Sequence, residues 1–216
     1  MPLIRSVFQD ELDSVSQTLF DLSVMVSDSM ARATKSVMTK DLKLAEDVIT
    51  SDEKIDTVQH ELDARIIDII ARQQPVASDL RALITALRMS ADLERMGDLA
   101  HHVAKLVRLR HPASAVPAEL LALVEVIGET AEKIATKTGV VISTRDVSLA
   151  AQVEKDDDEM DERHRKLISA LVEPSWPHGV ETAIDLTLLG RYYERYADHA
   201  VSVSRRVIFL VTGKFA

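Results

Sequence analysis

Hydrophobic positions in the first half of the chain recur every three or four residues, the spacing of one face of an α-helix. Two glutamines and Pro75 interrupt this pattern, because proline is not tolerated inside a helix. Ser78 and Asp79 follow, and we expect them to supply a capping side chain and a negative charge at the start of the next helix. The helices predicted for this half span residues 7–38, 42–71 and 80–109.

The same pattern starts again in the second half, behind RHPASAVPAE at residues 110–119, a segment rich in proline, alanine and serine. A second break, EPSWPHG, covers residues 173–179, and Trp176 within it is expected to pack across the entrance of the next helix. The short β-prone run GVVIST at residues 139–144 is interpreted as the end of a helix. The helices predicted for this half span residues 119–143, 148–172 and 180–211.

The two halves align with each other and form an internal repeat. The chain is therefore predicted to be all-α, with two tandem, internally duplicated three-helix bundles in residues 1–111 and 112–216, and with helices about 45 Å long. Matched pairs in the second helix of each half are Asp41/Asp146, Leu44/Leu149, Ala45/Ala150, Val48/Val153, Asp52/Asp157 and Asp56/Asp161. Matched pairs in the third are Ile84/Ile184, Glu94/Glu194, Arg95/Arg195, Asp98/Asp198, Ala100/Ala200, Val103/Val203 and Val107/Val207.

The composition supports this class and excludes several functions. Hydrophobic residues make up 46% of the chain and aromatic residues only 4%, with 6 glycines and 6 prolines, which is typical of long packed helices. A formal charge of −9 argues against nucleic acid as a partner. The chain has no cysteine, which removes thiolate chemistry and fits a reducing compartment. No apolar run reaches the length of a membrane span and the N-terminus does not resemble a signal peptide, so a cytoplasmic location is expected.

The repeated acidic residues are the chain's clearest candidate site. Residues four positions apart share one face of a helix, so Glu94 and Asp98 lie together, as do Asp52 and Asp56. If the second and third helices of each half are antiparallel neighbours, each set of four carboxylates converges. The two sets are Asp52, Asp56, Glu94 and Asp98, and Asp157, Asp161, Glu194 and Asp198.

Several like charges at close range need compensation, and a cation is the direct form of it. Carboxylate oxygens without thiolates favour a hard or borderline ion, so iron, manganese, zinc or magnesium is the type expected. A second interpretation remains open, in which the acids form a solvated face of a metal-free scaffold. Arg95 and Arg195 can pair with neighbouring acids or reach an anion, and the surrounding acids favour pairing.

Histidines suggest a third interpretation, a carboxylate-bridged di-metal oxidoreductase, because Asp98 with His101 and Asp161 with His164 have a three-residue spacing. The repeat argues against this, since the histidines are not duplicated as the carboxylates are, and the Glu-x-x-His motif of such enzymes is absent. His101 and His164 are interpreted as surface or supporting groups. The chain also lacks a glycine-rich phosphate loop, a Gly-x-Ser-x-Gly elbow and a cysteine nucleophile, so no catalytic residue is assigned.

The residues resemble the PhoU family of bacterial phosphate regulators over nearly the whole chain. The resemblance rests on the duplicated Glu-Arg-x-x-Asp, in DLRALITALRMSADLERMGDLAHHVAK at residues 79–105 and RYYERYADHA at residues 191–200, and on the acidic pairs of the preceding helices. The amino-acid sequences of several segments are similar to those of actinobacterial members. The resemblance implies two three-helix bundles and multinuclear iron or zinc sites at the two sets of four carboxylates.

The resemblance also implies a function: a cytoplasmic adaptor, not an enzyme, and a negative regulator of the phosphate-starvation response. Such a protein connects the ATPase subunit of the phosphate ABC transporter to the sensor histidine kinase and modulates phosphate uptake, so that it meets the membrane only through its partners. A homodimer is also expected. The chain departs from the family pattern where Asp replaces Glu in both second-helix pairs, where Leu99 matches His199, and where Gly179 matches Asp79.

Overall fold

The computed structural model of the chain describes residues 2–214, with side chains from residue 7 onward, and consists of long α-helices joined by short loops. The all-α prediction is confirmed, and the predicted helices agree with the observed ones to within about one turn, except that the first begins earlier. Residues 139–143 are helical, as expected. The helices are α1 (Pro2–Thr39), α2 (Leu42–Gln73), α3 (Ala77–Arg110), α4 (Ala118–Thr144), α5 (Val147–Leu171) and α6 (Gly179–Thr212).

The first residues of the helices show which side chains cap them. The N-cap carboxylate of α2, Asp41, accepts a hydrogen bond from the Leu44 amide at 3.0 Å, and the repeat-matched Asp146 caps α5 in the same way. The prediction that Ser78 caps the third helix is wrong. Helix α3 starts at Ala77, three residues before the predicted start at residue 80, so Ser78 lies inside the first turn and its hydroxyl donates to Asp79 instead. Asp79 does place a negative charge in that first turn, as predicted.

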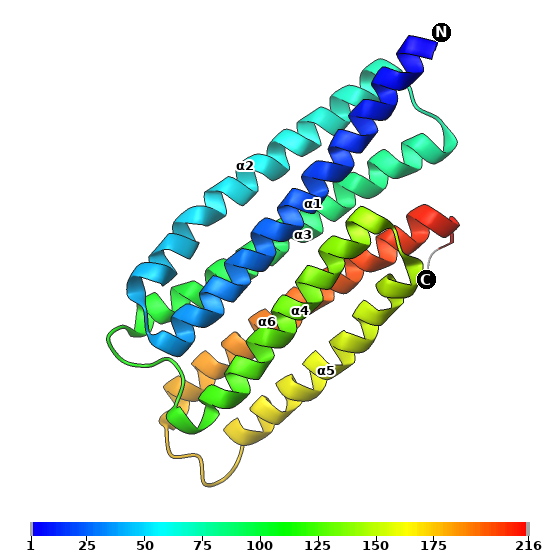
Figure 1. Cartoon of the computed structure of the whole chain (residues 1–216). Helices are drawn as coiled ribbons and strands as arrows, with labels where there is room; N and C mark the ends of the chain where they lie inside the picture. The colour runs from blue at the N-terminus through cyan, green and yellow to red at the C-terminus, as the bar shows by residue number, and fades with distance from the viewer. Residues whose placement is uncertain (1, 215–216) are drawn as a thin grey trace.

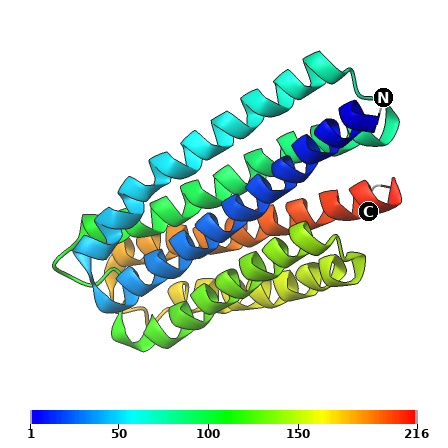
Figure 2. The same cartoon turned by 45° about the horizontal axis from the view of Figure 1, so that its top comes forward.

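The helices form two three-helix bundles, α1–α3 and α4–α6, that lie side by side (Figure 1). Helices α1 and α3 of the first bundle contact α4 and α6 of the second, while α2 and α5 lie on the outer sides, as a second view shows (Figure 2). Helices α3 and α6 run in opposite directions along their contact (Figure 1). The duplicated architecture predicted from the sequence is therefore present, and the two copies are joined face to face.

Polar contacts cross between the bundles as well as apolar ones. The Tyr193 hydroxyl on α6 lies 2.8 Å from the Thr34 hydroxyl on α1, and the Tyr196 hydroxyl donates to the Val26 carbonyl at 2.9 Å. At the end of α3, Arg110 donates twice to Asp185 of α6. Buried apolar residues of both bundles form one continuous core, so the division into domains 1–111 and 112–216 stays a prediction.

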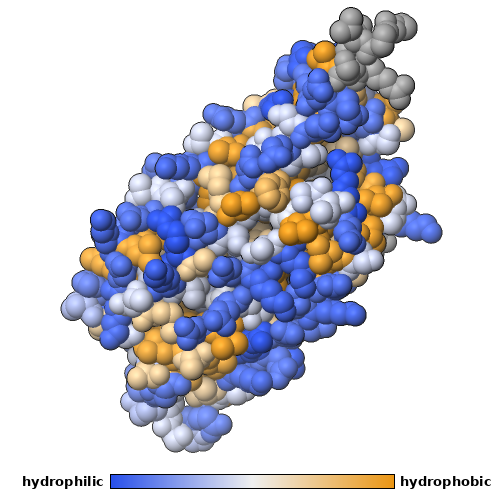
Figure 3. Space-filling view, in the orientation of Figure 1, coloured by the Kyte–Doolittle hydropathy of each residue, from blue (hydrophilic) through white to orange (hydrophobic). Residues whose placement is uncertain are grey.

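The Trp176 prediction is confirmed. Its indole nitrogen donates to the Gly179 carbonyl at 2.8 Å, and its ring packs against the core beside the start of α6. Hydrophilic residues cover much of the face seen in Figure 3, with apolar residues in separate patches among them. Within residues 2–214, none of the helices combines the length and the apolar character that a membrane crossing requires.

Candidate metal centres

The first acidic patch, defined as Asp52, Asp56, Glu94 and Asp98, is built by α2 and α3, which are neighbours in the first bundle. Gly97 lets the two helices approach closely: a methyl group at that position would lie 3.3 Å from Asp52 Oδ1. Asp52 is buried, and the other three carboxylates are partly exposed. The predicted side chains therefore come from facing positions on adjacent helices.

Electrostatics show that the four groups of this patch affect one another. Burial, followed by the charges of Asp52 and Asp98, raises the pKa of Asp56 above its ordinary value. Burial, followed by Asp98, also raises the pKa of Glu94, with smaller contributions in the same direction from Asp56 and Asp52, while Arg95 opposes them. Asp56 and Glu94 are thus harder to ionise because they are partly buried and their neighbours are charged, which is the condition that a bound cation would relieve.

The second acidic patch, defined as Asp157, Asp161, Glu194 and Asp198, is built in the same way by α5 and α6. Burial raises the pKa of Asp157 to about 6, and Asp198, Asp161, Asp158 and Glu194 add to the increase. One oxygen of Asp157 is buried without a hydrogen-bond partner. A buried carboxylate oxygen with no donor beside it is unusual, and a cation is one partner that would satisfy it.

The raised pKa of Asp157 predicts a pH-dependent stability difference. A carboxyl that holds its proton more tightly when folded than unfolded costs stability as the pH rises from about 4 towards 6, and the cost persists above that range. We expect metal-free Asp157→Asn to be more stable than the unsubstituted chain at pH 7 by about 1 kcal/mol, after discounting for the partial exposure of the carboxyl. At pH 3.5 the Asp157 carboxyl is neutral in the folded chain and mostly neutral in the unfolded chain, so the difference becomes small.

Urea unfolding of both proteins at pH 3.5, 5 and 7, in the presence of a chelator, measures this difference. Asp47→Asn, at an exposed position of α2, is the matched control and is expected to leave stability unchanged at all three pH values. The prediction would be contradicted if the stability that Asp157→Asn gains over the unsubstituted chain were smaller at pH 7 than at pH 3.5.

His101 contacts the first acidic patch, which agrees with the supporting role that the sequence analysis gave as one interpretation. Its Nδ1 is hydrogen-bonded to Asp52 Oδ2, and its Nε2 is buried without a partner. The three-residue spacing from Asp98 was the only sequence feature that pointed to it. Val201 stands at the matching position of the second copy and cannot make this contact, so the two patches differ chemically, in line with the histidines not being duplicated in the sequence.

Within residues 2–214, no three histidine, aspartate or glutamate side chains already have the arrangement of a metal-ion site. Arginines account for part of this absence, because they are hydrogen-bonded to carboxylates of the two patches. Arg95 donates to Asp98 at 2.6 Å, as the sequence analysis expected, and Arg191 is hydrogen-bonded to Glu194. Arg195, the repeat partner of Arg95, was also expected to pair with an acid but has no ion pair among the described side chains. The eight carboxylates as metal ligands stay a prediction, and binding would require these side chains to turn.

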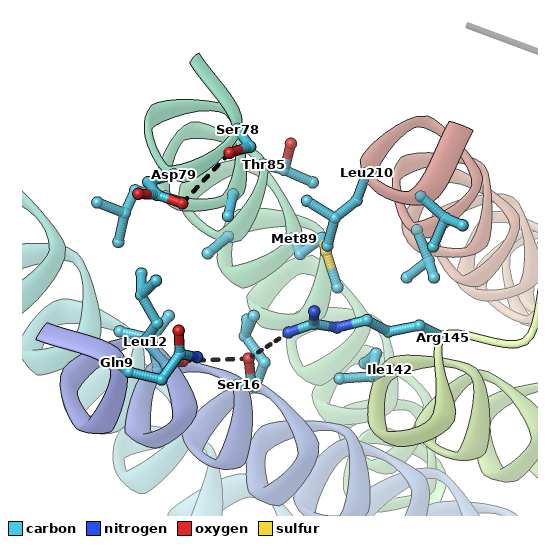
Figure 4. A pocket seen from close by; sticks show the side chains of 17 residues that line it. Gln9, Leu12, Ser16, Ser78, Asp79, Thr85, Met89, Ile142, Arg145 and Leu210 are labelled. Carbon is cyan, nitrogen blue, oxygen red and sulfur yellow. Dashed lines mark hydrogen bonds between the residues drawn. The ribbon is translucent and has the colours of Figure 1, made fainter. Parts of the chain in front are cut away.

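A separate cavity of about 420 Å³ lies near the start of α3, away from both acidic patches (Figure 4). Leu12, Met89 and Leu210 contribute apolar walls, and Arg145 donates to the Ser16 hydroxyl at 3.3 Å. None of the eight predicted ligands lines this cavity, which is mostly apolar. Its residues lie between the two bundles and gave no periodic motif that sequence reasoning could have recognised.

Fold and site together define a class of protein: a tandem-duplicated, all-helical bundle with one acidic patch in each copy. A family model, "PhoU domain", matches residues 19–107 and 124–207. The chain belongs to the PhoU family. The matches place one copy of the domain in each half, and the family expected from the sequence is confirmed.

Relatives and solved structures agree with this assignment. The chain is 44% identical over 212 residues to "Phosphate-specific transport system accessory protein PhoU homolog 1" of Mycobacterium leprae, covering 98% of this chain and 96% of that protein. It is 42% identical to PhoU homolog 2 of Mycobacterium tuberculosis, with 98% and 100% covered. The crystal structure of PhoU from Pseudomonas aeruginosa matches with a TM-score of 0.83 at 28% identity, over 96% of this chain and 100% of that one. PhoU from Streptococcus pneumoniae shares the fold, with a TM-score of 0.87 at 23% identity, over 97% and 99%.

Proposed function

We propose that this protein is a cytoplasmic adaptor that represses the phosphate-starvation response and modulates phosphate uptake, without catalytic activity of its own. The observation that carries the proposal is the nearly full-length similarity to proteins named as accessory to the phosphate-specific transport system. Its partners on this proposal are the ATPase subunit of the phosphate ABC transporter and the sensor histidine kinase. A homodimer is part of the same proposal.

Two exposed apolar stripes support an adaptor role. On α3, Val76, Leu80 and Ile84 are spaced by four residues and are exposed just before and within the first two turns of the helix. On α6, Val180, Ile184 and Leu188 repeat this spacing. Because α3 and α6 run in opposite directions, the stripes lie towards opposite ends of the molecule (Figure 1). Helical faces of this kind can receive partner helices, and two of them can engage two partners.

We further propose that the two acidic patches bind iron or zinc, with manganese or magnesium as alternatives, and that the ion sets the shape of the partner faces. The unsatisfied oxygen of Asp157 and the mutually raised pKa values fit a cation. A bound cation would supply charge compensation and would link α2 to α3 and α5 to α6. Because the stripes lie on α3 and α6, a change in how these helices sit against their neighbours would alter both surfaces.

Binding to purified partners tests the proposal. We expect Ile84→Asp and Ile184→Asp each to weaken binding to one partner at least tenfold, because each places a charge in an apolar contact. The exposed Val126 of α4 lies outside both stripes, so Val126→Asp is the matched control and should bind both partners normally. Unchanged affinity of both isoleucine variants for the ATPase subunit and for the kinase would contradict the assignment of these surfaces.

The contribution of metal is tested in the same assay with one protein in two states. Chelator-treated protein and protein reloaded with zinc or iron are compared for kinase binding. We expect reloading to change the affinity, since the ion constrains the helices that carry the stripes. A single affinity for both states would remove the metal from the signalling role.

A further inference from the structure

A groove with a volume of about 480 Å³, lined by both charged and apolar side chains, lies between α3 and α6, where the two bundles meet. Three guanidinium groups line it: Arg95 from α3, and Arg191 and Arg195 from α6. The rings of His102 and Tyr192 also line the groove and stack on each other, with centroids 5.2 Å apart and planes inclined by 21°. This central groove contains none of the apolar stripe residues and only one carboxylate of the acidic patches, Asp98.

The three arginines of the central groove differ in how they are neutralised. Arg95 donates to Asp98 at 2.6 Å and lies 3.6 Å from Glu94, so it is paired within the first acidic patch. Arg191 is paired with Glu194 of the second acidic patch. Arg195 is exposed and has no hydrogen bond or ion pair among the described side chains. The groove therefore holds one unpaired cation and two cations that carboxylates partly cancel.

The paired carboxylates connect the groove to both candidate metal centres. Asp98 belongs to the first patch and Glu194 to the second, so each patch contributes one acid that holds a groove arginine. An oxygen that binds a cation gives up charge that would otherwise attract a guanidinium. Occupation of the patches would thus weaken both arginine pairs and make the groove more positive.

We propose that the central groove binds a phosphate-type oxyanion, either free inorganic phosphate or the phosphoryl group of a nucleotide, and that Asp98 and Glu194 lower its affinity until a cation engages them. Three guanidiniums from two helices offer the planar, forked donors that suit tetrahedral oxyanions. His102 adds a further ring at the groove wall. The cation dependence rests on the metal sites proposed above, but the anion site itself does not.

Thermodynamic linkage relates oxyanion binding in the groove to cation binding in the acidic patches. If a cation in the patches increases the affinity for the oxyanion, the oxyanion must increase the affinity for the cation by the same factor. The oxyanion and the cation would then each favour binding of the other. The groove lies on the α3–α6 contact that joins the bundles. A ligand at that contact is placed to change how the bundles sit against each other.

Equilibrium dialysis of the full chain against radiolabelled inorganic phosphate, in the presence of a chelator, tests the groove without any metal. Asp98→Asn combined with Glu194→Gln removes both competing charges, and we expect this variant to bind phosphate about tenfold more tightly than the unsubstituted chain. Asp47→Asn combined with Glu53→Gln removes two exposed acids of α2 that lie outside both patches and is the matched control. Adding Arg191→Gln and Arg195→Gln to the first variant should abolish binding, whereas adding Arg108→Gln, at an exposed position of α3, should not.

The outcomes separate the anion site from the proposed function. Equal phosphate affinity in the first variant and in the control pair, or binding that survives the loss of Arg191 and Arg195, would overturn the site even if metal binds. Competition by ADP, measured in the same cell, identifies the source: stronger binding of ADP assigns the groove to a nucleotide phosphoryl group, and phosphate binding that ADP does not displace assigns it to free phosphate. Absence of metal from the unsubstituted protein would remove the proposed cation coupling and would leave the chelator experiment as the test of the groove.

Discussion

Replacing Gly128 by valine is expected to destabilise the protein by about 3 kcal/mol, the upper end of the usual cost of overpacking a core. Gly128 lies on α4 where this helix meets α1, and a methyl group added there would fall 2.3 Å from the Thr34 side chain. Valine improves the helix propensity over glycine by only a few tenths of a kcal/mol, so packing decides the sign. Gly139, three turns later on the same helix, faces Ser23 of α1 in the same way.

Urea unfolding, followed by circular dichroism, measures the effect of Gly128→Val. Ala122→Val adds the same side chain at an exposed position of α4 and is expected to change stability by less than about 0.7 kcal/mol. Combining Gly128→Val with Thr34→Ala should recover part of the loss, because the side chain that clashes is removed. Equal stability of Gly128→Val and Ala122→Val would show that the contact between α1 and α4 does not depend on glycine.

The second large effect is expected from cation binding. An ion that binds the folded protein alone stabilises it by about 2.7 kcal/mol at a hundred times its Kd, for each site. We therefore expect the chelator-treated chain to unfold at a clearly higher temperature once zinc or iron is added. The effect should be weaker below pH 6, because the ion must displace the proton held by Asp157.

A variant without the second acidic patch separates the two centres. Replacing Asp157, Asp161, Glu194 and Asp198 by their amides should remove the stabilisation that the second centre provides and retain that of the first. Replacing four exposed acids outside the patches is the control for charge: Asp47, Glu53, Glu162 and Glu173. If both variants gained the same stability from the ion as the unsubstituted chain, the patches would not be where the ion binds.

The sequence was sufficient to predict the helices and the duplicated architecture. Apolar spacing and a few prolines mark every helix, and an internal repeat implies two similar bundles. The start of α3 was misjudged because a serine followed by an aspartate has the composition of a cap, while the backbone turns into the helix before Ser78. Propensity identifies residues that can cap a helix but not the residue at which the chain turns.

The candidate site was predicted less completely than the fold. The repeat identified eight carboxylates because both copies carry them, and the structure brings each set of four to adjacent helices. The repeat could not predict that His101, which only one copy has, contacts Asp52. It also could not predict the pairing of Arg191 with Glu194. The contact between Asp52 and His101 joins residues 49 positions apart, and the central groove depends on the contact between α3 and α6. Spacing along one helix contains no information about such contacts.

The central claim is that the duplicated carboxylates bind metal, and elemental analysis tests it most directly. Protein purified without chelator and without an affinity metal is compared with a variant carrying Glu94→Gln, Asp98→Asn, Glu194→Gln and Asp198→Asn, after both are shown to be folded. We predict stoichiometric iron, zinc or manganese in the unsubstituted protein and its loss from the variant. Equal metal content in both folded proteins, or none in either even after incubation with iron, zinc and manganese salts, would contradict the claim.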